Sequence, residues 1–217
     1  TDESSDITAG QSELDVTAQM KSLQDALNRR GESADVVRDG AGKIKVHYRV
    51  SRNPLVSIII PTKDRWDMLR QCIKSVESVT RYPSYEIVVV DNGSRTAKAK
   101  EYLSTLSKKW IIHRFPGPFN FSEINNYGAS KANGEFLLFL NDDTQVIAPE
   151  WMSAMVAQAQ RTGVGAVGAK LLYPSGMIQH AGVVLGIRGV AGHAFRHLRG
   201  DTQHYRGLPH MLRNCSA

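Results

Sequence analysis

The segment LVSIIIPTKDR (55–65) decides the fold of this 217-residue chain. Its first six residues form an apolar run rich in β-branched side chains, which is typical of a strand buried on both faces. Pro61 and Thr62 end the run, and charged residues follow at 63–65. A strand of this kind needs neighbouring strands beside it and helices above and below it, so the rest of the chain should supply them.

Similar runs recur along the chain and alternate with apolar residues at helical spacing. They predict further strands at 85–90, 109–114, 136–140 and 163–170, and helices that start near Trp66, Arg95, Ser122 and Pro149, with Ser122 as a helix cap. The alternation predicts an α/β fold, with an open, mostly parallel twisted sheet and helices on both faces. Ligands of such sheets bind beyond the carboxyl ends of the strands, so the residues after each run are the candidate site.

Residues 1–53 differ from residues 54–217 in their pattern of apolar residues. Val16, Met20, Leu23 and Leu27 recur at helical spacing, and KIKVHYRV (43–50) alternates as a strand with one solvated face does. We therefore expect a small N-terminal appendage of one helix and one strand, or a linker from an upstream domain. Residues 54–217 form the main domain.

Composition places the chain among ordinary soluble globular proteins, with 41% hydrophobic and 22% charged residues. No apolar run approaches the roughly 20 residues that cross a bilayer. Cys72 and Cys215 make neither a disulfide framework nor a zinc site, which fits a reducing cytoplasm, and the helical setting of Cys72 predicts a core residue.

The net charge of +6 is concentrated in residues 54–217, which carry 19 basic and 12 acidic side chains. This excess suits phosphate-bearing ligands or a peripheral contact with an anionic membrane surface. A solvated surface with a slight excess of Lys and Arg explains it equally well. No basic stripe interleaved with aromatic residues appears, so we expect no nucleic-acid partner.

The strongest chemical signal is FLLFLNDDT (136–144), in which two adjacent carboxylates follow an apolar strand. Carboxylates this close resist joint ionisation unless a cation compensates them. Oxygen ligands with open positions suit Mg²⁺ or Mn²⁺, which also takes oxygens from phosphate. The alternative is that Asn-Asp-Asp makes a turn or a helix cap.

Two other strand ends carry polar residues. In VVVDNGS (88–94), Asp91 can accept hydrogen bonds from a base or a ribose hydroxyl. Taken alone, the tetrapeptide DNGS (91–94) is an ordinary turn. In IIIPTKDR (58–65), Pro61 and Thr62 can flank a planar base. No glycine-rich phosphate loop follows this strand, so a metal and basic side chains must meet any diphosphate charge.

The ordered series VSIIIPTKDR, YEIVVVDNGS and PFNFSEINNYGASKANGEFLLFLNDDT resembles the family 2 glycosyltransferases of the glycosyltransferase A fold, which is Rossmann-like. It is most similar to bacterial enzymes of O-antigen assembly, including rhamnosyltransferase-like members. The resemblance covers roughly residues 54–215. It implies inverting transfer of a sugar from a UDP- or dTDP-linked donor to a glycan or lipid-linked acceptor, with a divalent metal, in the cytoplasm or at the inner face of the membrane.

The resemblance also assigns residues. The nucleotide-binding set it implies comprises Pro61, Thr62, Asp64, Asp91, Asn141 and Asp142. Asp143 is the best metal ligand, with Asp142 beside it, and Asn141 departs from the family's Asp at the first motif position. The family carries its catalytic carboxylate in a later segment, so we expect the base beyond Ala217 and little transfer by residues 1–217 alone.

Several alternatives stay open at this point. A non-catalytic module that binds nucleotide sugars would share the same motifs. A sugar-phosphate nucleotidylyltransferase would need a glycine-rich basic loop after the first strand, and a phosphoacceptor signalling domain would need a carboxylate pair there. The tract from Ile178 to His210 holds five histidines and four arginines. They either reach the diphosphate or metal, or fill hydrogen-bond roles in a polar surface segment.

Overall fold

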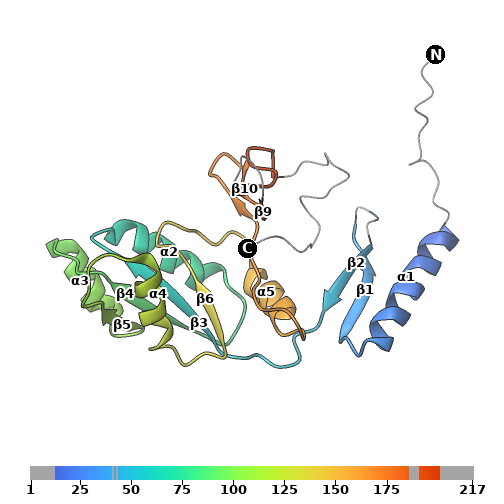
Figure 1. Cartoon of the computed structure of the whole chain (residues 1–217), viewed down its shortest axis with the longest axis horizontal. Coiled ribbons are helices and arrows are strands. Elements are labelled where there is room, and N and C mark those ends of the chain that lie inside the picture. Colours follow the sequence, from blue (N-terminus) through green and yellow to red (C-terminus); the bar gives the residue numbers. More distant parts are fainter. Residues whose placement is uncertain (1–12, 41, 43, 186–190, 201–217) are drawn as a thin grey trace, which may run out of the picture. The chain divides into compact units, whose positions relative to one another are not determined.

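The strand formed by Val56–Thr62 pairs with a parallel strand on each side (Figure 1). The computed structural model describes residues 13–40, 42, 44–185 and 191–200. The four strands of this sheet, in their order across it, are β5 (Ile111–Arg114), β4 (Tyr85–Asp91), β3 (Val56–Thr62) and β6 (Phe136–Phe139). All three pairings are parallel, which confirms the predicted open parallel sheet.

Helices cover both faces of this sheet, as the alternating sequence predicts (Figure 1). The helices are α2 (Trp66–Val79), α3 (Ala97–Leu106), α4 (Phe121–Ala129) and α5 (Trp151–Ala159). On one face, Ile58 and Ile60 belong to the core formed with α2, α3 and α5. On the other face, Ile59 packs in a second core with Ile124 of α4. All three isoleucines are fully buried, which explains the continuous apolar run in β3.

The start of α4 differs from the prediction. Ser122 is not the cap, because Asn120 takes that position with an extended backbone. The Asn120 side chain accepts hydrogen bonds from the backbone N–H groups of Ser122 and Glu123, at 3.1 and 3.2 Å. Asn and Ser are both strong caps; the observed cap lies two residues before the predicted one, and the helix begins at Phe121.

The strand predicted at 163–170 is wrong, because residues 164–170 form neither helix nor strand. Three glycines interrupt this segment, and Gly163 adopts a φ of 85°. Glycine lacks a side chain to pack and weakens a strand interior. The chain forms short antiparallel pairs instead. These are β7 (Leu171–Leu172) with β8 (Ile178–His180), and β9 (Val183–Leu185) with β10 (Ala191–His193).

The N-terminal appendage contains one strand more than predicted. Helix α1 (Glu13–Arg29) precedes an antiparallel hairpin of β1 (Ala34–Arg38) and β2 (Ile44–Tyr48). The missed strand, ADVVR, is short and half-buried. The sequence feature that could have indicated it is the Asp39-Gly40 pair that follows, because Asp-Gly is typical of hairpin turns. Arg161, after α5, pairs with Glu32 at 3.2 Å and lies 4.1 Å from the centre of the Tyr48 ring.

The chain divides after Arg161 into two compact units, Thr1–Arg161 and Thr162–Ala217. The first contains the parallel sheet and the N-terminal hairpin, and the second contains β7 to β10. The boundary expected near residue 53 stays a prediction. Within the described ranges, no helix is long and apolar enough to cross a membrane.

Gly128 of α4 tests the packing of the smaller core. A Cβ atom at this position would lie 2.5 Å from Ile59 Cγ2 and 2.9 Å from Val90 Cγ2. Gly128→Ala should therefore lower the free energy of unfolding by about 1–3 kcal/mol, because the buried neighbours cannot move away. Urea denaturation measures this change. Gly40→Ala is the matched control, since a Cβ there meets nothing within 4 Å. Equal stability of the two variants would contradict the packing.

Candidate functional site

Strand register brings the candidate residues to one edge of the sheet. Thr62, the last residue of β3, lies opposite Asp91 of β4, and Asp91 lies opposite Arg114 of β5. The loop with Asn141 follows β6 at the same edge, where Leu140 donates a backbone hydrogen bond to Ile59 at 3.0 Å. The sequence did not single out Arg114, because its place beside Asp91 follows only from the pairing of β4 with β5.

A buried hydrogen bond joins β3 to the acidic loop. The Thr62 hydroxyl donates to Asp142 Oδ2 at 2.8 Å, and both residues are about 94% buried. The Cys72 thiol of α2 donates to the Asn141 carbonyl at 3.6 Å, which holds the start of the loop. Burial raises the pKa of Cys72 to about 12, so Cys72 is an unreactive core thiol, as predicted. The loop is therefore anchored from two elements.

The two carboxylates of this loop differ in environment. Asp142 is buried, whereas the Asp143 side chain is half-exposed. Burial raises the pKa of the Asp142 carboxyl, while the Thr62 hydroxyl and the Arg65 guanidinium act in the opposite direction. Arg65 lies 3.3 Å from Asp142 Oδ1 and 3.4 Å from Asp143 Oδ2. A cation therefore already faces both acids.

A second set of hydrogen bonds connects the loops after β3 and β4. Asp64 adopts a φ of 57°, and its backbone N–H donates to Ser94 Oγ at 2.9 Å. Its carboxylate accepts from the backbone N–H groups of Arg95 and Thr96 at 2.7 and 2.8 Å. Ser94 in turn donates its own N–H to Asp91 Oδ1 at 2.8 Å. The role of Asp64 in nucleotide binding stays a prediction, because the contacts seen here are to these loops.

Asn92, the amide of the VVVDNGS motif, is a buried polar residue to which the sequence assigned no role. Its backbone N–H donates to the Thr62 carbonyl at 2.9 Å, and its side-chain amide donates to the Gly117 carbonyl at 3.3 Å. The Asn92 Oδ1 atom is buried, and it has no partner within the described part of the chain. Asn92 therefore ties the ends of β3 and β4 to the segment after β5.

The acidic loop suits a metal that arrives with phosphate. Over the described ranges, no three His, Cys, Asp or Glu side chains gather as a metal cage. Mg²⁺ and Mn²⁺ commonly use one or two carboxylates, with waters and phosphate oxygens as the other ligands. Asp143, half-exposed beside Asp142, fits this donor set.

The histidine tract lies in the second unit. His180 Nδ1 and His193 Nδ1 are 3.0 Å apart, and His197 stacks on Tyr173 with ring centres 5.6 Å apart. Burial lowers the pKa of His180, and neighbouring His193 lowers it further. His180 and His193 thus have the hydrogen-bond role that was one of the two alternatives for this tract, and His197 has a packing role that the sequence did not indicate. His204 and His210 lie outside the described residues.

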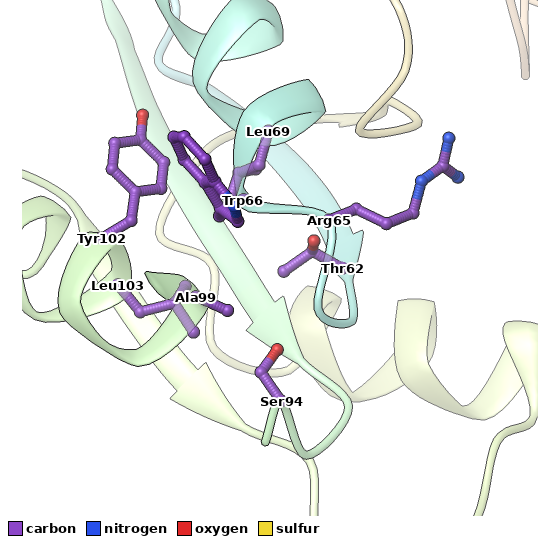
Figure 2. A pocket seen from close by; sticks show the side chains of 8 residues that line it. All are labelled: Thr62, Arg65, Trp66, Leu69, Ser94, Ala99, Tyr102 and Leu103. Atoms are coloured by element: carbon purple, nitrogen blue, oxygen red, sulfur yellow. The ribbon is translucent and has the colours of Figure 1, made fainter. Parts of the chain in front are cut away.

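A shallow pocket lies beside the loops, where α2 and α3 begin (Figure 2). Thr62 and Ser94 line it on the side of the strand ends, and Trp66 and Tyr102 line it on the side of the helices. Two cations, Arg70 and Lys98, each lie within 6 Å of the centre of the Trp66 ring. The pocket therefore combines aromatic and hydroxyl side chains next to the site.

Comparison with known proteins identifies the class. Residues 57–213 match glycosyl transferase family 2. The chain belongs to this family, and its fold is that of glycosyltransferase A. Over 75% of its length it superposes on mannosyltransferase PcManGT from Pyrobaculum calidifontis, solved with GDP-Man and Mn²⁺. The TM-score is 0.50, the identity is 20%, and 47% of that chain is covered.

Two curated relatives are much closer in sequence. The chain is 45% identical over 183 residues to the O-antigen biosynthesis protein RfbC of Myxococcus xanthus, and 43% identical over 205 residues to the uncharacterized protein y4gI of Sinorhizobium fredii. These alignments cover 82% and 91% of the chain, but only 14% and 22% of the relatives. The family match decides against a nucleotidylyltransferase or a phosphoacceptor domain.

The Asp64 carboxylate generates a prediction about pH. Hydrogen bonds from the Thr96 and then the Arg95 backbone hold its pKa below the ordinary value of 3.8. A carboxyl with a lowered folded-state pKa stabilises the fold at neutral pH, and this contribution disappears as the pH falls through the lowered value. Wild type should therefore exceed Asp64→Asn in stability at pH 7, and the difference should shrink below pH 3.8. Urea denaturation at pH 7 and pH 3 measures it; a constant difference would contradict the assignment.

Proposed function

We propose that the chain binds a UDP- or dTDP-linked sugar, and that the protein transfers this sugar with inversion to a glycan or lipid-linked acceptor. The transfer would depend on Mn²⁺ or Mg²⁺ and serve the biosynthesis of bacterial surface polysaccharide. Family membership and the similarity to an O-antigen biosynthesis protein support this proposal. A cytoplasmic location, with a peripheral contact to the membrane, belongs to the same proposal.

The observation that carries the proposal is the meeting of three loops at one sheet edge. Thr62 and Asp91, at the ends of β3 and β4, and the Asp142-Asp143 pair after β6 all lie where ligands of parallel sheets bind. A nucleotide across this edge would meet Asp91 with its base or ribose and the acidic pair with its diphosphate. Pro61 and Asn141 flank these two positions in the chain.

Asp143 and Asp142 would hold a divalent ion together with the diphosphate, and the ion would offset charge that develops on the leaving diphosphate. Mn²⁺ in the structure of PcManGT with GDP-Man supports this choice of metal. The Thr62 hydroxyl fixes the orientation of the Asp142 carboxylate from within the core. Asp91 accepts from the base or ribose, while its contact with Ser94 keeps its loop in place.

Inverting transfer also needs a group that takes the proton of the attacking acceptor hydroxyl. That hydroxyl approaches the anomeric carbon from the face opposite the leaving diphosphate, so its base lies across the sugar from the acidic pair. In this proposal none of the described residues takes that proton. Asp91, Asp142 and Asp143 bind and orient the donor.

The metal dependence is tested by titration calorimetry with UDP, dTDP and GDP. Wild type should bind its nucleotide more tightly with Mn²⁺ than without it, since the ion joins the diphosphate to Asp143. Asp143→Ala should remove most of this gain while the melting temperature changes little, because the side chain is half-exposed. Asp25→Ala, at an exposed position of α1, is the control and should keep the full gain. Equal wild-type affinity with and without metal would end the metal hypothesis.

Asp91 is tested with the same titrations. Asp91→Ala should weaken UDP or dTDP binding by about tenfold to a hundredfold, because a hydrogen bond to a charged group is worth about 1.5–3 kcal/mol. Asp91→Asn is the sharper variant, since its amide oxygen can still accept from the Ser94 N–H and keep the loop. A dissociation constant unchanged in both variants would remove Asp91 from the site.

A further inference from the structure

Arg65 contacts both carboxylates of the acidic loop, the two residues that the proposed function assigns to a metal. Its two terminal nitrogens contact different acids, Nη1 at 3.3 Å from Asp142 and Nη2 at 3.4 Å from Asp143. Figure 2 shows the Arg65 side chain directed away from Trp66 and Tyr102. Arg65 therefore contributes its charge to the acids rather than to the aromatic side of the pocket.

The N-cap position does not explain this residue, although its Nη2 atom also contacts Met68 Sδ in the helix that follows. Arg65 is the N-cap of α2, and its side chain makes no capping hydrogen bond. Ser, Thr, Asp and Asn are preferred at this position, and a positive charge is unfavourable at the N-terminal end of a helix. An arginine that opposes local helix chemistry indicates a role elsewhere, and the two carboxylates are the charged groups that it contacts.

We propose that Arg65 is the resident counter-ion of the Asp142-Asp143 pair, and that a divalent metal must displace it. This inference rests on the proposed function, and it adds that tight binding of the metal requires the nucleotide. Metal alone competes with Arg65 and binds weakly. When a nucleoside diphosphate binds as well, its phosphate oxygens give the released guanidinium a new partner. Metal and nucleotide are then bound cooperatively at this site.

The geometry of the guanidinium suits this exchange. Its planar, five-donor fork can contact two carboxylates at once, and the same fork binds phosphate. The Arg65 side chain is 46% exposed, so it can turn from the acids to a phosphate without disturbing the core. Asp142 stays in place during the exchange, because the Thr62 hydroxyl still holds it.

The decisive experiment titrates Mn²⁺ alone into Arg65→Gln. Removing the competing cation should tighten Mn²⁺ binding by about two- to thirtyfold, as expected for the loss of two partly exposed ion pairs. A gain of affinity cannot arise from damage to the fold. Arg52→Gln, which removes an exposed arginine paired with Glu135, is the matched control and should leave Mn²⁺ affinity unchanged. Adding Asp143→Asn to Arg65→Gln should abolish the gain, which locates it at the acidic pair.

Arg65→Lys is a second variant that keeps the positive charge. It separates the loss of charge from the loss of the arginine side chain, even if Arg65→Gln folds poorly. Its Mn²⁺ affinity should stay within about twofold of wild type. A gain as large in Arg65→Lys as in Arg65→Gln would contradict the counter-ion role. Mn²⁺ affinity in Arg65→Gln equal to or weaker than that of wild type would also overturn it.

A second titration separates this inference from the proposed function. The increase in UDP affinity caused by Mn²⁺ should be smaller in Arg65→Gln than in wild type. In this variant Mn²⁺ binds without displacing Arg65, so the nucleotide is not needed to draw the guanidinium away from the acids. Absence of that increase in wild type would overturn the proposed metal dependence. An intact wild-type increase together with an unchanged one in Arg65→Gln would overturn the Arg65 inference alone.

Discussion

The pairing of β3 with a parallel neighbour on each side is the constraint on which the site depends. Parallel strands end at the same edge, so the residues after β3, β4 and β6 meet although they are far apart in sequence. Thr62 and Asp142, separated by 80 positions, form a buried hydrogen bond for this reason. A shift of β3 by one residue would turn Ile59 and its neighbours to the wrong faces and would break this bond.

The sequence predicts the sheet well because burial on both faces leaves a simple signal. Ile58, Ile59 and Ile60 have no solvent-exposed face, and their run reads as a central strand. The signal fails where packing is weak. The glycine-rich segment 163–170 has enough apolar residues to resemble a strand but few side chains to hold it. The Ala34–Arg38 strand is half-buried, and only pairing in the folded hairpin defines it.

The same contrast holds for the site. Sequence motifs predict some of its residues, whereas the contacts between them are known only from the fold. Strand ends pointed to Asp91 and to the acidic pair, because ligand sites of parallel sheets lie there. They did not indicate which acid is buried, nor that Arg65 contacts both. Asp64 belongs to a charged stretch in the sequence, yet its carboxylate caps the backbone of the next loop. These facts depend on side-chain partners 30 to 80 positions away, which no local pattern encodes.

Three departures from local stability rules lie at this edge. Asp142 is a buried carboxyl whose pKa burial raises, Arg65 occupies a cap position that disfavours it, and Asp64 has a left-handed backbone. Natural sequences depart from such rules mainly where function requires it. Each departure is supported by a rigid neighbour, since Thr62 holds Asp142 and Ser94 holds Asp64. The buried sheet therefore stabilises an arrangement of charges that the loops alone would not adopt, and this arrangement is what a charged ligand can rearrange.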